Sequence, residues 1–255
     1  MLRAISSERI KYRRTATPWL SVAAPLGLAA LSTWYVSGSG PSWAGLSRVV
    51  LEVWTMICIP AGAALFAGLA STLEDGGGGW TALRVRPISP ARLLGAKLVI
   101  LLLYTLASSL LLGALAGAAG MVLGLPGGVP WAALLVLGAV SWCCALPLLV
   151  FQLWVAEAWG AGAAPAAGIP GLLLAALLGG TSLGGEVDGV WRFVPWAWPA
   201  RAFPPALAAS GLDPGSWTAP DSPEGVVQAT CTLSVVLACG LAAASLVWFS
   251  RRDVC

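Results

Sequence analysis

The sequence contains no histidine, and charged residues make up only 10% of its 255 residues. Without histidine the chain lacks the usual general acid–base side chain and the commonest ligand of transition metals. Six cysteines are present, but none forms a C-x-x-C pair or another spacing typical of metal ligands. These absences count against catalysis, so we expect no catalytic residue and no metal site in this chain.

The chain also lacks a nucleotide-binding loop. The dipeptide Gly-Lys does not occur, which excludes the G-x-x-x-x-G-K-[ST] motif. No charged residue falls in the middle of a long apolar run, whereas ion-coupled carriers usually place such residues near the membrane midplane. Any use of ATP therefore belongs to a partner, and coupling to protons or sodium is disfavoured.

Apolar residues, by contrast, make up 58% of the chain, which is more than a soluble domain usually contains. Six apolar runs are long enough to cross a bilayer: residues 18–36, 49–70, 93–123, 131–153, 166–183 and 226–249. The loops between them are too short to fold separately. We therefore predict one all-α integral membrane domain over residues 1–255, with six transmembrane helices.

The basic residues predict its orientation. Of fourteen Lys and Arg, five lie in the first fourteen residues, four in 84–97 and two at 251–252, while Arg48, Arg192 and Arg201 fall on the other side. The positive-inside rule then places both chain ends in the cytoplasm. At the amino end, Arg3, Ser7, Lys11 and Arg14 lie opposite Leu2, Ile5 and Tyr12 on a helical wheel. This pattern predicts an amphipathic interfacial helix, although an unstructured basic flank would explain the same residues.

Tryptophan, proline and glycine mark three further features. Trp54 and Trp142 lie deep in their runs, where either helix packing or a ligand cavity could occupy an indole, so they are our candidates for a substrate path. Between the fifth and sixth runs, Pro195, Trp196, Trp198 and Pro199 predict an external segment that re-enters the outer leaflet or caps a cavity. The third run carries two GxxxG spacings, at Gly113, Gly117, Gly120 and Gly124, which predict close helix contact.

The loop after the second run carries the most specific pattern. Glu74 and Trp80 precede the stretch Leu-Arg-Val-Arg-Pro-Ile-Ser-Pro-Ala-Arg-Leu at 83–93, and Ala96-Lys97 follows. This order resembles the Glu…Trp…Leu-x-x-Leu-Pro-Val-Ser-x-x-Arg-Leu…Ala-Lys pattern in permease subunits of type-two ATP-binding cassette exporters. The stretches 153–154, 168–171 and 194–196 are similar to the branch of this family that serves lantibiotic immunity and bacteriocin export, or multidrug export. Arg86 and the four glycines at 76–79 depart from the family pattern.

The resemblance implies a cytoplasmic coupling helix after the second span that docks on an ATPase. The coupling residues would be Glu74, Trp80, Leu83, Arg84, Arg86, Pro87, Ile88, Ser89 and Arg92. Simpler explanations are a solvated carboxylate for Glu74 and the positive-inside rule for the basic residues. The family also implies two cytoplasmic ATPase subunits that hold ATP and magnesium, and a second permease, either the same chain or a homologue. No cofactor in this chain and no nucleic acid are implied.

From these features we expect a permease in the bacterial plasma membrane that exports amphipathic or hydrophobic cargo, such as a peptide antibiotic or a lipophilic drug. This expectation includes no enzymatic activity of the chain itself. The alternative from another class is a membrane scaffold or assembly protein that transports nothing. A secondary carrier comes third, because the middle of each run lacks charge.

Overall fold

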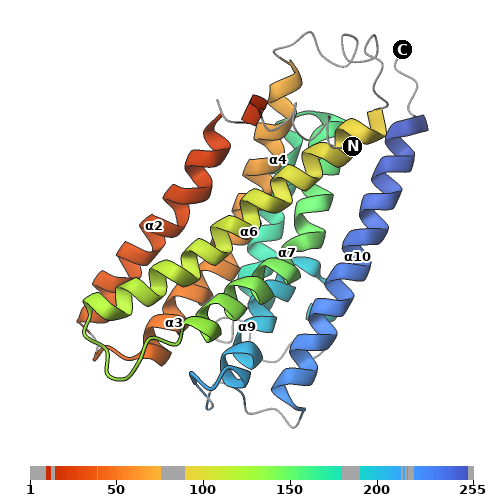
Figure 1. The fold of residues 1–255 in the computed structure, drawn as a ribbon. Helices are drawn as coiled ribbons and strands as arrows, with labels where there is room; N and C mark the ends of the chain where they lie inside the picture. Colours follow the sequence, from red (N-terminus) through yellow and green to blue (C-terminus); the bar gives the residue numbers. More distant parts are fainter. Residues whose placement is uncertain are drawn as a thin grey trace.

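The computed structural model describes residues 10–12, 15–38, 40–75, 90–179, 190–213, 215, 217 and 221–251, and the regular elements in these ranges are all helices. The elements are α2 (Ala16–Ser37), α3 (Trp43–Val53), the π-helical turn η1 (Trp54–Cys58), α4 (Ile59–Asp75), α6 (Pro90–Val122), α7 (Trp131–Trp159), α8 (Ala163–Gly179), the 3-10 turns η2 (Val190–Phe193) and η3 (Pro195–Ala197), α9 (Trp198–Ala209) and α10 (Pro223–Arg251). The long helices pack side by side as one bundle (Figure 1).

Five helices are long and apolar enough to cross a membrane: Ala16–Ser37, Trp43–Leu73, Ala91–Val122, Trp131–Trp159 and Pro223–Arg251. They coincide with five of the six apolar runs. The remaining run, the fifth at 166–183, overlaps α8, whose 17 described residues are fewer than the roughly 20 that a spanning helix needs. The prediction of an all-helical membrane protein is confirmed, whereas the count of six spans and the cytoplasmic placement of both ends stay predictions. The interfacial helix predicted at the amino end lies mostly outside the described residues.

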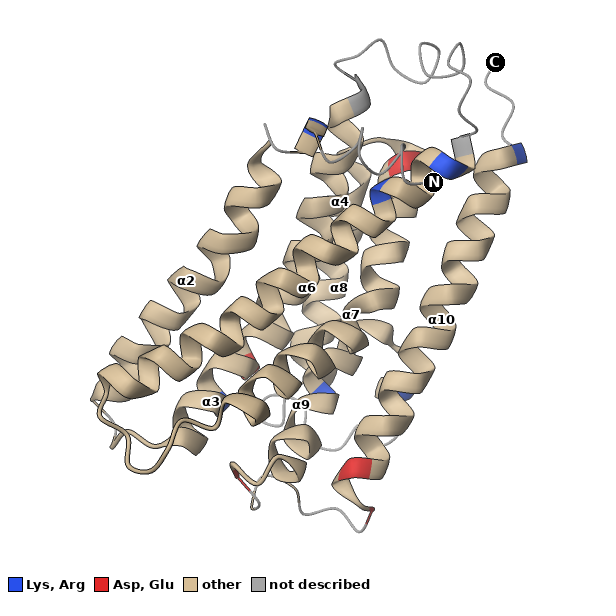
Figure 2. Ribbon diagram, viewed as in Figure 1, with Lys and Arg blue, Asp and Glu red and all other residues tan. Residues whose placement is uncertain are grey.

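The bundle has two distinct ends. At one of them, α4 finishes at Asp75 and α6 begins at Pro90, and the last turns of α7 and α10 lie at the same end (Figure 1). We call it the α4–α6 end. The opposite end, where α6 finishes and α7 begins, is the α6–α7 end. Charged residues gather toward these two ends, and the helix lengths between them are mostly free of charge (Figure 2).

Glycines let α6 and α7 approach until their backbones touch. A Cβ atom on Gly113 would lie 2.7 Å from the carbonyl oxygen of Leu134, and one on Gly138 would lie 2.7 Å from that of Ser109. Any side chain at either position would therefore push the two helices apart. Gly117 and Gly120 lie against the rings of Trp131 and Trp43. The close contact predicted from the glycine spacing is confirmed at Gly113, Gly117 and Gly120, whereas Gly124 lies beyond α6 and a Cβ atom there would meet nothing within 4 Å.

Candidate functional site

A small apolar cavity of about 50 Å³ lies among η1, α4, α6 and α7. Its walls include Trp54, Cys58, Gly62, Phe66, Thr105, Ser108, Ser109, Trp142 and Leu149. The two tryptophans proposed for a substrate path, although far apart in the sequence, thus line the same cavity. None of the described residues that line it is charged. Such a lining suits an apolar ligand that offers few polar groups.

The wall around Trp54 departs from regular α-helix. Residues 54–58 form a π-helical turn between α3 and α4. This geometry is rare in proteins overall, but where it occurs it is often found at functional sites. The hydroxyl of Thr55 donates to the carbonyl oxygen of Leu51 at 2.8 Å, which satisfies it within the helix. The indole N–H of Trp54 is buried and has no hydrogen-bond acceptor among the described residues.

Trp142 on α7 is held by a hydrogen bond. Its indole N–H donates to the hydroxyl of Thr105 at 3.1 Å, and this bond joins α7 to α6. The hydroxyl of Thr105 donates in turn to the carbonyl oxygen of Leu101 at 2.9 Å. Trp142 therefore joins two helices and also lines the cavity, while its part in a substrate path stays a prediction.

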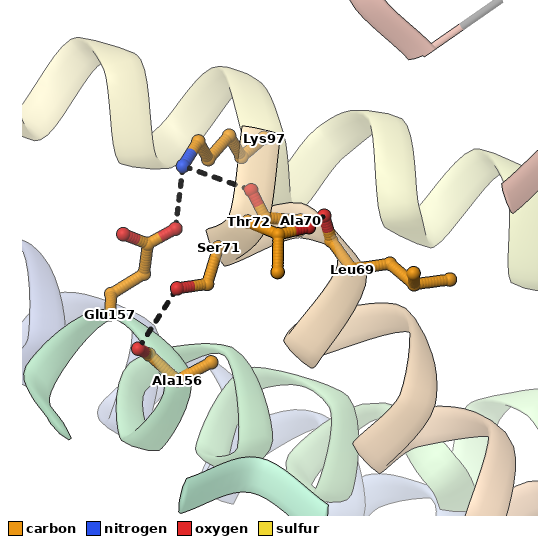
Figure 3. A network of polar contacts seen from close by, with 7 residues as sticks. All are labelled: Leu69, Ala70, Ser71, Thr72, Lys97, Ala156 and Glu157. Carbon is orange, nitrogen blue, oxygen red and sulfur yellow. Dashed lines mark hydrogen bonds and ion pairs between the residues drawn. The ribbon is translucent and has the colours of Figure 1, made fainter. Parts of the chain in front are cut away.

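A buried ion pair lies at the α4–α6 end of the same helices (Figure 3). The ammonium of Lys97 is 2.6 Å from the carboxylate of Glu157, and the two side chains are 0% and 1% exposed. Lys97 also donates to the carbonyl oxygen of Ala70 at 3.4 Å, and the hydroxyl of Ser71 donates to that of Ala156 at 3.2 Å. These bonds join the end of α4, the start of α6 and the end of α7.

In the sequence, Lys97 belongs to the basic stretch 84–97 and to the family pattern, and Glu157 follows the fourth apolar run. Sixty positions separate the two residues, so spacing along the chain could not pair them. A usable signal was nevertheless present, because both residues lie inside otherwise apolar helix turns. Charged residues in such surroundings are usually paired and functional.

The structure does not describe most of the predicted coupling residues. Trp80, Leu83, Arg84, Arg86, Pro87, Ile88 and Ser89 lie outside the described ranges. Glu74 falls in the last turn of α4, and Arg92 is an exposed residue near the start of α6. The two flanks of the coupling segment thus lie at the same end of the bundle (Figure 1), and its role stays a prediction.

The predicted external segment packs deeply against the bundle. Trp198 is 3% exposed, contacts Cys144 near the middle of α7, and donates its indole N–H to the carbonyl oxygen of Arg192 at 3.1 Å. Pro199 is buried beside Trp198, whereas Pro195 is half-buried. The end of α9 packs against Leu137, nearer the start of α7. Helix α9 therefore follows the half of α7 that leads to the α6–α7 end.

Trp196 reaches further along the bundle than the rest of this segment. Its ring meets Phe151 edge to face, with centroids 5.4 Å apart, and a Cβ atom on Gly171 would collide with its indole. Arg201, on α9, donates to the carbonyl oxygen of Leu178 at 2.6 Å, and burial lowers the pKa of its guanidinium. The predicted role of these residues as an outer cap depends on the orientation in the membrane and stays a prediction.

One further buried polar residue was not predicted from the sequence. Gln152 on α7 is fully buried, and neither atom of its amide group has a hydrogen-bond partner among the described residues. It faces α8 at Gly168, where a Cβ atom would lie 3.5 Å from its amide nitrogen. Buried amides without partners are uncommon in native proteins. Elsewhere in the described ranges, no group of three or more His, Cys, Asp or Glu side chains could hold a metal ion.

The helices, the uncharged cavity and the charge at the two ends together define a multi-pass membrane protein with an internal apolar site. A family model described as "ABC-2 family transporter protein" matches residues 4–161, more than half of the chain, and the chain belongs to this family. No curated protein matches it. In this family the chain is the membrane component, so ATP hydrolysis lies in a separate ATP-binding cassette subunit. The matched residues include the cavity and the Lys97–Glu157 pair.

Proposed function

We propose that this chain is the permease subunit of an ATP-binding cassette exporter that moves amphipathic or hydrophobic cargo. The cargo would be a peptide antibiotic or a lipophilic drug, and the location a bacterial plasma membrane. The observation that carries the proposal is the uncharged cavity that lies between helices of a chain in this transporter family. Trp54 and Trp142 would contact the cargo there, through ring faces and through the unpartnered indole N–H of Trp54.

The working complex would contain two such permeases, identical or homologous, and two cytoplasmic ATPase subunits that bind ATP and magnesium. The segment 76–89 joins α4 to α6, and both helices line the cavity. A docked ATPase that pulls on this segment would therefore act on two walls of the cavity at once. ATP binding would shift the bundle between states that differ in affinity for cargo. Glu74 and Arg92, at the two flanks, would contact the ATPase.

The external segment would complete the path on the other side. Helix α9 packs along α7 and α10, and its buried Trp198 lies close to the middle of α7. Pro195, Trp196, Trp198 and Pro199 would form a cap that limits access from outside while the cavity is open to the membrane or the cytoplasm. Rigid aromatic and proline residues suit this task because little conformational entropy is lost when they are buried.

Gly62 offers a position from which a larger side chain can enter the cavity. Gly62 lines the cavity, and a Cβ atom placed on it would meet no atom within 4 Å. The variant Gly62→Phe should therefore occupy the space where cargo binds. Gly27→Phe is the matched control, because Gly27 is also a helical glycine with open space around its Cβ position and lies on α2, away from the cavity.

The measurement is ATP-dependent transport of a lipophilic fluorescent dye and of an amphipathic peptide by the permease–ATPase complex in proteoliposomes. Gly62→Phe should lower transport at least about tenfold, the loss expected when about 1.4 kcal/mol of binding is removed, while basal ATP hydrolysis persists. Gly27→Phe should transport normally. Full transport by Gly62→Phe would exclude the cavity as the path. An assembled wild-type complex that hydrolyses ATP but moves neither probe would favour the scaffold alternative.

A further inference from the structure

The Lys97–Glu157 pair and the cavity belong to the same three helices. The pair and its neighbouring hydrogen bonds join α4, α6 and α7, and the cavity lies between these helices together with η1. Thr105 of the cavity wall follows Lys97 by eight residues on α6, and Leu149 precedes Glu157 by eight on α7. At a rise of 1.5 Å per residue, the pair lies about 12 Å from the cavity along both helices.

The pair also adjoins the segment that the family expects to meet the ATPase. Ala70, which accepts a hydrogen bond from Lys97, lies in the second-last turn of α4, and Lys97 lies in the second turn of α6. These are the two helices that residues 76–89 connect. A force applied to that segment therefore reaches Lys97 and Ala70 before it reaches the cavity.

Burial makes this contact an all-or-none one. With side chains 0% and 1% exposed, the two charges resist separation, because each would lose this partner without gaining solvent. Small relative displacements of α6 and α7 are therefore opposed. A larger displacement has to separate the pair and admit another partner or water. Packed interfaces of this kind switch between discrete arrangements rather than deforming gradually.

We propose that Lys97 and Glu157 form a positioning clamp that transmits movement of the α4–α6 connection to α7, and thereby sets the width of the cavity in step with the ATPase. The proposal rests on the proposed function, since it assumes a docked ATPase. The bond from Ser71 to Ala156 supports the clamp by holding α4 against the same turn of α7. Neither charged residue would touch cargo or nucleotide.

The first arm of the test separates coupling from folding. The variants are Glu157→Gln, the charge exchange Lys97→Glu with Glu157→Lys, and the apolar pair Lys97→Met with Glu157→Leu. The control is Arg48→Met with Asp213→Asn, which removes another ion pair at the opposite end of the bundle. For each reconstituted complex, assembly, basal ATP hydrolysis and cargo moved per ATP hydrolysed are measured.

Glu157→Gln and the apolar pair should keep assembly and basal hydrolysis but lower cargo moved per ATP at least about fivefold, the lower range of typical coupling energies. The charge exchange should recover most of that loss, and the control should lose none. If Glu157→Gln fails to fold, the apolar pair decides, because it leaves no buried charge. A normal ratio of cargo to ATP in the apolar pair would overturn the clamp and leave the ion pair a purely structural contact.

The second arm does not depend on transport. In a cysteine-free background, spin labels at Thr72 on α4 and Trp159 on α7, both exposed, report the distance between the two helix ends. The wild type should show a narrow distance distribution that shifts as a unit when the ATPase binds ATP, and Glu157→Gln should show a broad one. Equal distributions would overturn the clamp. If wild-type complexes move no cargo in the first arm, the proposed function fails, and this second arm still decides whether the pair holds the helices together.

Discussion

The helices are held together by different kinds of contact at the two ends of the bundle. At the α4–α6 end, two fully buried charges and a pair of hydrogen bonds to backbone carbonyls join three helices. At the α6–α7 end, glycines bring two backbones into contact, and the rings of Trp131 and Trp43 cover Gly117 and Gly120 of α6. The ion pair at that end, Arg48 with Asp213, has side chains that are 52% and 20% exposed.

This difference indicates which end of the bundle can change between two arrangements of its helices. Close backbone packing has one geometry, because carbonyl oxygens and glycine Cα atoms leave no room for sliding. A buried ion pair has two discrete states, joined or separated. The separated state becomes accessible when water or another polar group takes the place of the lost partner. The end that adjoins the expected ATPase is thus the one with a contact that can be exchanged. The opposite end would act as a fixed pivot.

The largest effect should come from removing one charge of the buried pair. Lys97→Met leaves Glu157 buried without its cation, so the free energy of unfolding should fall by about 3–5 kcal/mol. The measurement is thermal unfolding of the permease in nanodiscs. The double variant Lys97→Met with Glu157→Leu should recover most of the loss, because it leaves no buried charge. Equal losses in the single and double variants would mean that the packing of the Lys97 stem matters more than its charge.

A smaller effect should come from the glycine contact at the other end. Gly113→Ala places a methyl group 2.7 Å from the carbonyl oxygen of Leu134, a backbone atom that cannot rotate away. The expected loss is about 1–3 kcal/mol, as for other overpacked sites. Gly27→Ala is the control and should gain slight stability from helix propensity, since its Cβ would meet nothing. If both substitutions stabilise the protein in the same unfolding measurement, the backbone contact of α6 and α7 is looser than described.

The smallest effect should come from the exposed pair. Arg48→Met and Asp213→Asn should each change the free energy of unfolding by less than about 1 kcal/mol, because both groups are partly hydrated. A double-mutant cycle in low and in high salt would measure this coupling directly. It should vanish near 1 M salt, whereas the coupling of Lys97 to Glu157 should persist, since ions screen exposed charges far more than buried ones. Equal salt sensitivity of the two pairs would remove the contrast between the ends.

Much of this architecture could be predicted from local sequence, and some of it could not. The apolar runs predicted the long helices to within a few residues at most ends, and the spacing of Gly113 and Gly117 predicted a close helix contact. The fifth run was harder, because Pro170 lies inside α8 and the described helix ends at Gly179. Trp54 and Trp142 were singled out for their depth alone. Their shared cavity depends on which faces of η1 and α7 turn toward α6, and a hydropathy pattern that is apolar on all sides carries no such information.

The sequence by itself determined that this protein is a helical membrane protein, where its helices lie, which residues are basic at the predicted inner side, and to which family it is similar. It could do so because transfer into lipid and positive-inside sorting act on short stretches of chain, residue by residue. Only the tertiary structure decided that Lys97 meets Glu157, that two distant tryptophans wall one cavity, and that Trp196 packs into the bundle against Gly171. These contacts join residues far apart in the chain, and their geometry depends on how whole helices rotate and cross when they pack.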